Sequence, residues 1–374
     1  MTNGPRVTEL RAQHSKPVQL RRHDDRRSTH HIHGRTVNTR ELPVVPDRRT
    51  VESAVALACR APSLHNSQPW RWVMGTALRL YSDPDRLLPA TDGFGRQMVI
   101  SCGAALNHLD YAFAANRWRP LIARLPRSSD RQLLSTIGFV PAPTPTDFVA
   151  RMAAAIERRR TERLPLDAPP AWTETLEQLV RITAGTGVEL EDLGERSRPA
   201  LEDASRRMTG LRHDDPTYQA ELRWWSGRGL FPDGVPEQAR PSDSQQHSVH
   251  LSREFPPGRA STPDGGPSED SAAILLLSTS SDSRLDWLRS GEALSAVLLA
   301  CTDRGLATCP VTHLTERAAT RTMLRELSSG DGMPQVLIRV GAGTGVGEPS
   351  PTPRRPLSEV LVRERPAPSN PPGE

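Results

Sequence analysis

Two stretches that lie far apart in the chain, residues 102–118 and 290–306, align without a gap and are both rich in small residues. The identical positions pair Gly103 with Gly291, Ala105 with Ala293, Leu106 with Leu294, and Ala112 with Ala300. Glycine and alanine let two helix backbones approach closely. The pattern predicts two copies of one architecture in a single chain, packed together through these helices. The alternative is a chance match between two alanine-rich helices.

Length and charge narrow the class of protein. The 374 residues suffice for one large domain or two ordinary ones. The formal net charge is +4, but residues 1–40 hold nine basic and only three acidic side chains, so the rest of the chain is slightly acidic. The basic character therefore belongs to an extension and not to the folded body. We expect no nucleic-acid partner.

Cysteine usage and hydropathy indicate the compartment. The four cysteines are scattered without C-x-x-C spacing, which is typical of neither a zinc site nor a disulfide framework. The chain has no run of 18 apolar residues and no apolar N-terminal stretch. We therefore expect a cytoplasmic protein with no metal site and no membrane partner.

Composition also divides the chain. Residues 1–40 lack periodicity and are expected to form a disordered basic extension, and residues 365–374 a disordered tail. Between them we expect a first half over residues 41–147 and a second half over residues 148–364. The proline- and glycine-rich stretch at 227–271 is long enough to predict a lid-like insertion in the second half.

Apolar periodicity predicts a buried helix over residues 96–118 and an earlier helix with Thr50 as its N-cap. The earlier helix leads into APSLHNSQPWRW, residues 61–72, in which serine, histidine, asparagine and glutamine side chains lie between two prolines. A surface turn and a ligand-binding loop are the two interpretations of this polar run.

A second polar motif is ERRRTERLP at residues 157–165. Arg159, Thr161 and Arg163 alternate, so on an extended backbone their side chains point the same way. Two guanidinium groups and a hydroxyl can hold a phosphate, and a solvated basic helix end is the alternative. The glycine-rich GAGTGVGEP at 341–349 lacks the spacing of a dinucleotide loop, and the G-x-S-x-G of many hydrolases is absent.

These motifs, in this order, resemble those of nitroreductase-type flavoproteins over roughly Asp47 to Val362. The first loop is similar to the family's P-S-x-x-N-x-Q-P-W, RRRTER to its R-x-S-x-[RK] phosphate element, and TPRRPLSEV to its [KT]-x-R-x-P-L-x-E-V ending. With both halves in one chain, the sequence looks most like the Acg-type branch of dormancy-associated actinobacterial proteins. The resemblance implies an α+β, nitroreductase-like fold with two pseudo-equivalent halves, each a mixed or antiparallel sheet flanked by helices.

The resemblance also implies an FMN site shared by the two halves. The residues matched to the phosphate site are Arg159, Thr161, Arg163 and Arg354. The residues matched to the flavin ring are Pro62, Ser63, Asn66, Gln68, Val311 and Thr312, of which Val311 and Thr312 belong to the stretch GLATCPVTHL that faces N5 in the family. His313 follows directly and is the only acid–base candidate.

The function implied is an oxidoreductase that passes electrons from NAD(P)H through FMN to a small electron-poor acceptor, such as a nitroaromatic or a quinone. The alternative is an FMN-binding protein whose closed lid sequesters the flavin with little or no turnover. The chain is expected to be a monomer that mimics the family's dimer, or a homodimer of such chains.

Overall fold

The computed structural model describes residues 45–226, 233–260, 269–343 and 352–364, all within one unit, Leu42–Glu374. The extension expected over residues 1–40 and the tail expected over residues 365–374 lie outside the described residues. Residues 227–232 and 261–268 of the expected lid-like insertion also lie outside the described residues, whereas 233–260 are described.

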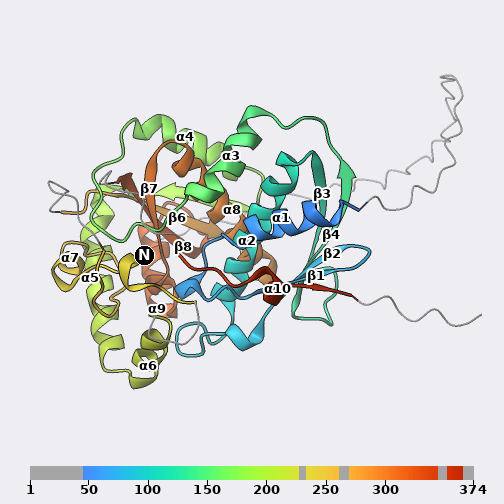
Figure 1. Cartoon of the computed structure of the whole chain (residues 1–374). Helices are drawn as coiled ribbons and strands as arrows, with labels where there is room; N and C mark the ends of the chain where they lie inside the picture. Colours follow the sequence, from blue (N-terminus) through green and yellow to red (C-terminus); the bar gives the residue numbers. More distant parts are fainter. Residues whose placement is uncertain (1–44, 227–232, 261–268, 344–351, 365–374) are drawn as a thin grey trace, which may run out of the picture. The chain divides into compact units, whose positions relative to one another are not determined.

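The two helices that align in the sequence, α2 (Arg96–Ala115) and α8 (Arg284–Asp303), pack side by side (Figure 1). Both are buried on most sides, because most of their residues are small or apolar. A Cβ added to Gly103 would overlap the carbonyl oxygen of Leu288, and a Cβ added to Gly291 would overlap that of Ile100. The predicted close approach through these glycines is confirmed, whereas the duplication itself stays a prediction.

A five-stranded mixed sheet has the strand order β3-β4-β2-β1-β9. Its strands are β1 (Trp70–Met74), β2 (Leu78–Ser82), β3 (Trp118–Arg124), β4 (Leu133–Pro141) and β9 (Leu361–Arg363). Alternate residues of β1 and β2 are buried against α2 and α1 (Arg48–Ala58). The N-cap of α1 is Asp47 and not Thr50 as expected, because the Asp47 carboxylate accepts a hydrogen bond from the Thr50 backbone N–H (3.0 Å).

A four-stranded antiparallel sheet has the order β5-β6-β8-β7, formed by β5 (Val188–Asp192), β6 (Ala273–Thr279), β7 (Leu306–Val311) and β8 (Met333–Ala342). Side chains alternate between the two faces along a strand. In β6 and β8 nearly all of them are buried, and helices cover both faces of this sheet. Leu275 and Leu277 of β6 pack with α8, α3 (Asp147–Arg158) and α4 (Trp172–Thr183). Ile274 and Leu276 pack on the other side, with α5 (Gly194–His213) and α9 (Ala318–Leu327).

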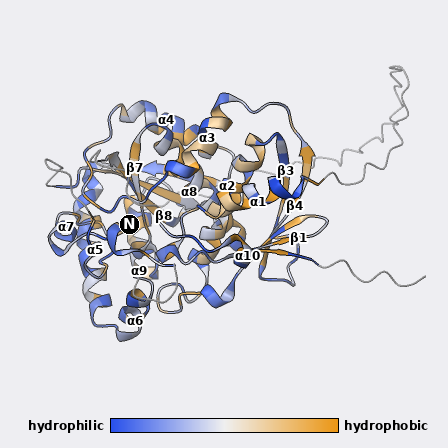
Figure 2. Ribbon diagram, viewed as in Figure 1, coloured by the Kyte–Doolittle hydropathy of each residue, from blue (hydrophilic) through white to orange (hydrophobic). Residues whose placement is uncertain are grey.

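The remaining helices are short: α6 (Pro216–Trp224), α7 (Asp243–His247) and α10 (Leu357–Val360). Figure 2 shows the contrast between the hydrophobic α2 and the largely hydrophilic α5 and α7. One mixed and one antiparallel sheet, each flanked by helices, confirm the predicted α+β class.

The C-terminal stretch returns to the first sheet. β9 pairs in parallel with β1, where Leu361 lies opposite Trp72. This pairing satisfies backbone groups of β1 that would otherwise form an open sheet edge. The expected halves, residues 41–147 and 148–364, stay a prediction, with the last strand of the second joined to the sheet of the first.

Candidate functional site

The polar loop after α1 is buried. His65, Asn66, Ser67 and Gln68 are each at most 8% exposed, which rules out the surface-turn interpretation. His65, Asn66 and Gln68 have φ of 51°, 56° and 49°, a backbone region that non-glycine residues rarely adopt. Ser63 holds this conformation, because its Oγ accepts a hydrogen bond from the Gln68 N–H (3.0 Å). Such buried, strained loops are found where surrounding structure fixes a functional conformation.

A cavity of about 100 Å³ opens beside this loop. The predicted site residues that line it are Pro62, Ser63, Thr161, Arg163, Val311, Thr312 and His313. They come from the loop after α1, the segment after α3, and the end of β7. Arg253 and Phe255, from the 233–260 segment, complete the wall. The fold therefore brings together most of the residues matched to a flavin site.

The side chains of Asn66 and Gln68 bind elsewhere. Asn66 Nδ2 donates to the carbonyl oxygens of Gly234 (3.0 Å) and Pro353 (3.1 Å). Gln68 Oε1 accepts from the Arg355 N–H (2.9 Å). These two amides fasten the 233–260 segment and the C-terminal stretch to the loop, and neither residue lines the cavity.

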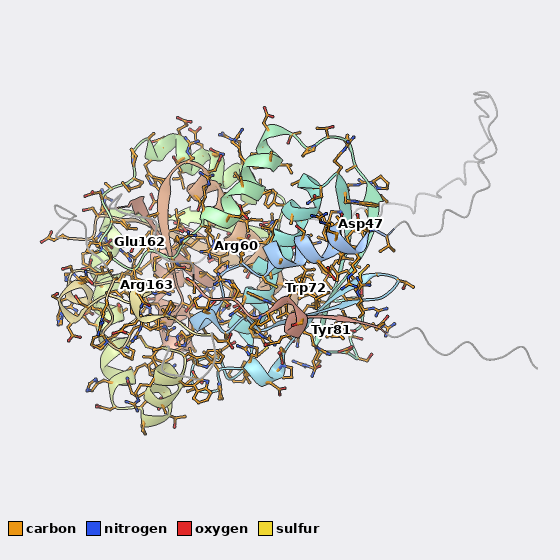
Figure 3. The ribbon with its side chains drawn as sticks, viewed as in Figure 1. Asp47, Arg60, Trp72, Tyr81, Glu162 and Arg163 are labelled. Atoms are coloured by element: carbon orange, nitrogen blue, oxygen red, sulfur yellow. The ribbon has the colours of Figure 1, made fainter. Side chains whose placement is uncertain are left out.

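Arg159 and Arg354 lie together with Arg60 and Arg160 in an arginine cluster. Arg60 precedes Pro62 by two residues, and Arg159 precedes Thr161 by two, so the cluster adjoins the cavity; Figure 3 labels Arg60 and Arg163. Their hydrogen bonds go to backbone carbonyls, most of them at the ends of α1 and α3, such as Arg354 Nε to Cys59 O (2.9 Å) and Arg60 Nη2 to Glu157 O (2.8 Å). Among the described residues, no carboxylate forms an ion pair with any of the four.

The electrostatics of the arginine cluster favour an anion. Burial and the neighbouring Arg354 lower the pKa of Arg159 to about 9. Burial and the charge of Arg60 lower the pKa of Arg354 to about 10. Arg159 is 6% exposed, and within the described residues its Nε and Nη1 have no hydrogen-bond partner. A buried donor without a partner costs free energy, so a phosphate placed here would both neutralise the repulsion and satisfy these donors.

No protein-family model matches the chain. Two Mycobacterium tuberculosis H37Rv proteins match most of it. The protein named "Uncharacterized protein Rv3127" is 43% identical over 324 residues, which are 84% of this chain and 94% of the relative. The protein named "Putative NAD(P)H nitroreductase acg" is 41% identical over 315 residues, 83% of this chain and 95% of the relative.

The chain belongs to the nitroreductase family, in its Acg-type branch. A solved structure described as a putative nitroreductase from Anabaena variabilis is 9% identical with a TM-score of 0.46, over 80% of this chain and 90% of that one. A likeness this distant adds nothing to the family assignment. No helix among the described residues of this nitroreductase is long and apolar enough to cross a membrane.

Two histidines, His65 and His313, line the cavity of this nitroreductase. His313 Nε2 lies 2.9 Å from Ser205 Oγ, while burial and the charge of Arg253 lower the pKa of His313 to about 3. Burial also lowers the pKa of His65 well below its usual value. Both shifts favour the neutral imidazole near pH 7.

His65 is a site residue that sequence reasoning passed over. Both of its ring nitrogens are buried and have no partner among the described residues, and its ring packs edge-on against Phe255 (centroids 5.7 Å apart). The signal for it in the sequence was its place inside the polar loop. Arg60 was missed as well, although it stands at the end of the preceding helix.

A buried ion-pair network holds the 233–260 segment in place. Glu316, whose side chain is 1% exposed, pairs with Arg253 and with Arg212 of α5. Arg253 Nη1 also donates to the Tyr218 hydroxyl (2.7 Å) on α6. One carboxylate therefore connects the wall of the cavity to α5 and to the turn that carries His313.

Proposed function

We propose that the chain is an FMN-dependent oxidoreductase that takes electrons from NAD(P)H and passes them to a small electron-poor acceptor such as a nitroaromatic or a quinone. The observation that carries this proposal is the arginine cluster beside the cavity, with the unpartnered nitrogens of Arg159. The name of the acg relative, an NAD(P)H nitroreductase, supports the same reaction.

In this proposal the residues fit FMN as follows. Arg159, Thr161, Arg163 and Arg354 hold the phosphate, with Arg60 and Arg160 completing the positive field. Pro62, Ser63, Val311 and Thr312 line the space for the flavin ring, with Asn66 and Gln68 holding that loop in shape. FMN when bound supplies the redox chemistry, accepting a hydride and passing on electrons. The chain orients the flavin and excludes water, and His313 and His65 offer neutral hydrogen-bonding nitrogens.

An anaerobic titration of the purified protein with NADPH, followed through the visible flavin band, tests the proposal. We expect a yellow protein that bleaches on addition of NADPH and recovers its colour with a quinone. A protein that is colourless and cannot be reconstituted with FMN would contradict it.

The second candidate function is flavin sequestration. It is favoured by the buried pairing of Arg253 with Glu316, because Arg253 and Phe255 narrow the cavity to about 100 Å³, below the roughly 300–1,000 Å³ of sites for drug-sized ligands. If the 227–271 insertion is a lid that stays shut, the protein will be yellow and will remain yellow with NADPH.

We also propose that one chain supplies both halves of the flavin site and that the protein works in the cytoplasm. All four cysteines are buried free thiols, which suits a reducing compartment. Light scattering of the flavin-loaded protein gives the oligomeric state, and one FMN per chain is expected for either a monomer or a homodimer of such chains.

A further inference from the structure

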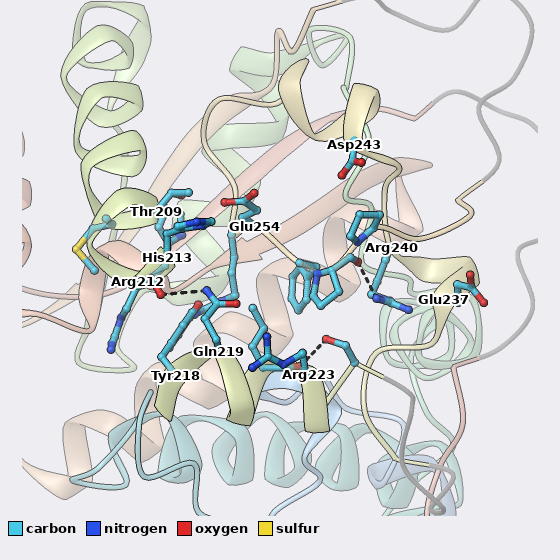
Figure 4. Close-up of a pocket in the computed structure, with 18 residues that line it drawn as sticks. Thr209, Arg212, His213, Tyr218, Gln219, Arg223, Glu237, Arg240, Asp243 and Glu254 are labelled. Carbon is cyan, nitrogen blue, oxygen red and sulfur yellow. Dashed lines mark hydrogen bonds between the residues drawn. The ribbon is translucent and has the colours of Figure 1, made fainter. Parts of the chain in front are cut away.

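A second and larger cavity, of about 580 Å³, lies between α5, α6 and the 233–260 segment (Figure 4). Its volume is within the range of small-molecule sites, about 300–1,000 Å³. It shares Arg253, Phe255 and His313 with the smaller cavity. The two cavities are therefore neighbours, separated by these side chains.

Charges of both signs surround the larger cavity. Arg223 of α6 lines it, and within the described parts of the chain no ion pair involves this arginine. Arg240 also lines it and donates to the carbonyl oxygen of Pro256 (2.7 Å). Glu254 and Asp243 also line the cavity, and Figure 4 shows both across from Arg223, with Asp243 on the same side as Arg240. A ligand here must satisfy guanidinium donors and carboxylate acceptors together.

The inner wall of this cavity is aromatic. Tyr218 and Phe255 are 3% and 8% exposed, and Leu222 lies beside them. The guanidinium of Arg212 lies over the Tyr218 ring, 4.5 Å from its centroid, and that of Arg163 lies over the Phe255 ring, at 5.3 Å. Two buried polar atoms at the wall, His313 Nδ1 and Arg212 Nε, have no hydrogen-bond partner among the described residues, and buried polar groups normally have one.

We propose that this cavity binds a nucleotide. Arg223 and Arg240 bind the phosphate, since guanidinium groups match phosphate oxygens. Glu254 and Asp243 accept hydrogen bonds from ribose hydroxyls, as acidic residues do in dinucleotide-binding folds. The base lies against the inner wall formed by Leu222 and Phe255, next to His313. A pyridine dinucleotide and an adenine nucleotide share this chemistry, and the site does not depend on the flavin function proposed above.

Isothermal titration calorimetry of the full chain with NADP⁺, NAD⁺ and AMP tests the proposal, because none of the three can reduce a flavin. We expect one molecule bound per chain and a loss of tenfold or more in affinity in Arg223→Ala. Arg206→Ala is the matched control, since Arg206 is an exposed arginine of α5 that does not line the cavity. Thr209→Trp, which fills the cavity from α5, should abolish binding without removing a charge.

The outcomes separate the two sources of the nucleotide. Binding of NADP⁺ or NAD⁺ with no heat from AMP identifies a docking site for the reductant, and comparable binding of AMP identifies an effector site. No heat from any of the three, or equal affinity in Arg223→Ala and the wild type, overturns the proposal. A protein that binds nucleotide but is not bleached by NADPH would contradict the proposed oxidoreductase function and leave this site standing.

Discussion

Gly103 of α2 and Gly291 of α8 meet where the two helices cross, so that a Cβ added to Gly103 would lie 3.0 Å from the Cα of Gly291. Ile100 and Leu294, one turn from this crossing, line the smaller cavity. The glycine contact therefore sets the distance between the two helices that form the base of that cavity.

Gly291→Ala should destabilise the protein by about 1–3 kcal/mol, because the new methyl group would push the helices apart. Urea unfolding measures the change. Gly210→Ala is the control: Gly210 lies on exposed α5 with no atom within 4 Å of an added Cβ, so that variant should gain roughly 0.5–1 kcal/mol from helix propensity. Equal stability of the two variants would contradict the close packing.

Arg159→Ala combined with Arg163→Ala should give a colourless protein that still folds. Loss of charged hydrogen bonds to the phosphate, each worth about 1.5–3 kcal/mol, should weaken FMN binding by at least ten- to a hundredfold. The melting temperature of the flavin-free protein should not fall, because the buried charge of Arg159 is unfavourable in the folded state. Arg158→Ala, an exposed neighbour near Asp303, should keep its flavin, and full retention of flavin in the double variant would mean that the phosphate binds elsewhere.

Glu316→Gln should release the 233–260 segment. The substitution leaves Arg253 buried without its carboxylate, while Arg212 keeps its pair with Asp215 (3.4 Å). Breaking a buried ion pair by removing one partner typically costs about 3–5 kcal/mol. Amide hydrogen exchange should speed up in this segment by tenfold or more, while α2 stays protected. Glu195→Gln, which breaks an exposed pair with Arg198, should cost about 0–1 kcal/mol and leave exchange in the segment unchanged. Unaltered exchange in Glu316→Gln would show that other contacts hold the segment.

Acid should destabilise the fold through its buried histidines. The pKa of His313 is lowered to about 3, and burial lowers those of His65 and His108 well below the usual value of 6.5. Between about pH 3 and 6.5 the unfolded chain binds protons that the folded chain does not, so stability rises with pH in this window and falls on acidification. Near pH 5 the cost from His313 alone is about 2 kcal/mol.

The free energy of unfolding of wild type and His313→Gln at pH 7 and pH 5 checks this effect. The variant should lose less stability than the wild type on acidification. An equal loss in both would show that His313 is protonated in the folded protein. Burial raises the pKa of Asp92 to about 6, so protonation of this carboxyl on acidification favours the folded state. This opposing effect is the same in the wild type and in the variant.

Local pattern located elements near the site but not all of their boundaries. The alternation of Arg159, Thr161 and Arg163 left an extended segment and a basic helix end both open, and the end of α3 at Arg158 favours the first. The close approach of α2 and α8 followed from glycines at matching positions. The same pattern carried the expected helix to residue 118, whereas α2 ends at Ala115 and Arg117, with φ of 63°, turns the chain into β3. Hydrophobic periodicity does not reveal where one residue with a positive φ reverses the direction of the chain.

Long-range partners could not be predicted in the same way. That Asn66 and Gln68 meet the flavin stays a prediction, and the sequence did not indicate that their amides also bond to residues more than 160 positions away in the chain. The unpartnered nitrogens of His65 also follow from what surrounds the ring and not from its neighbours in sequence. The pairing of β9 with β1 depends on the same kind of distant contact.

The return of the C-terminal stretch to the first sheet has a consequence for biosynthesis. Arg354 and β9 lie within residues 352–364, so the arginine cluster and the outer edge of the first sheet are completed only after this segment has left the ribosome. A nascent or truncated chain that stops before residue 352 has α1, α2 and the polar loop but lacks one of the four arginines. Assembly of the proposed phosphate site therefore comes late in synthesis, long after the polar loop has been made.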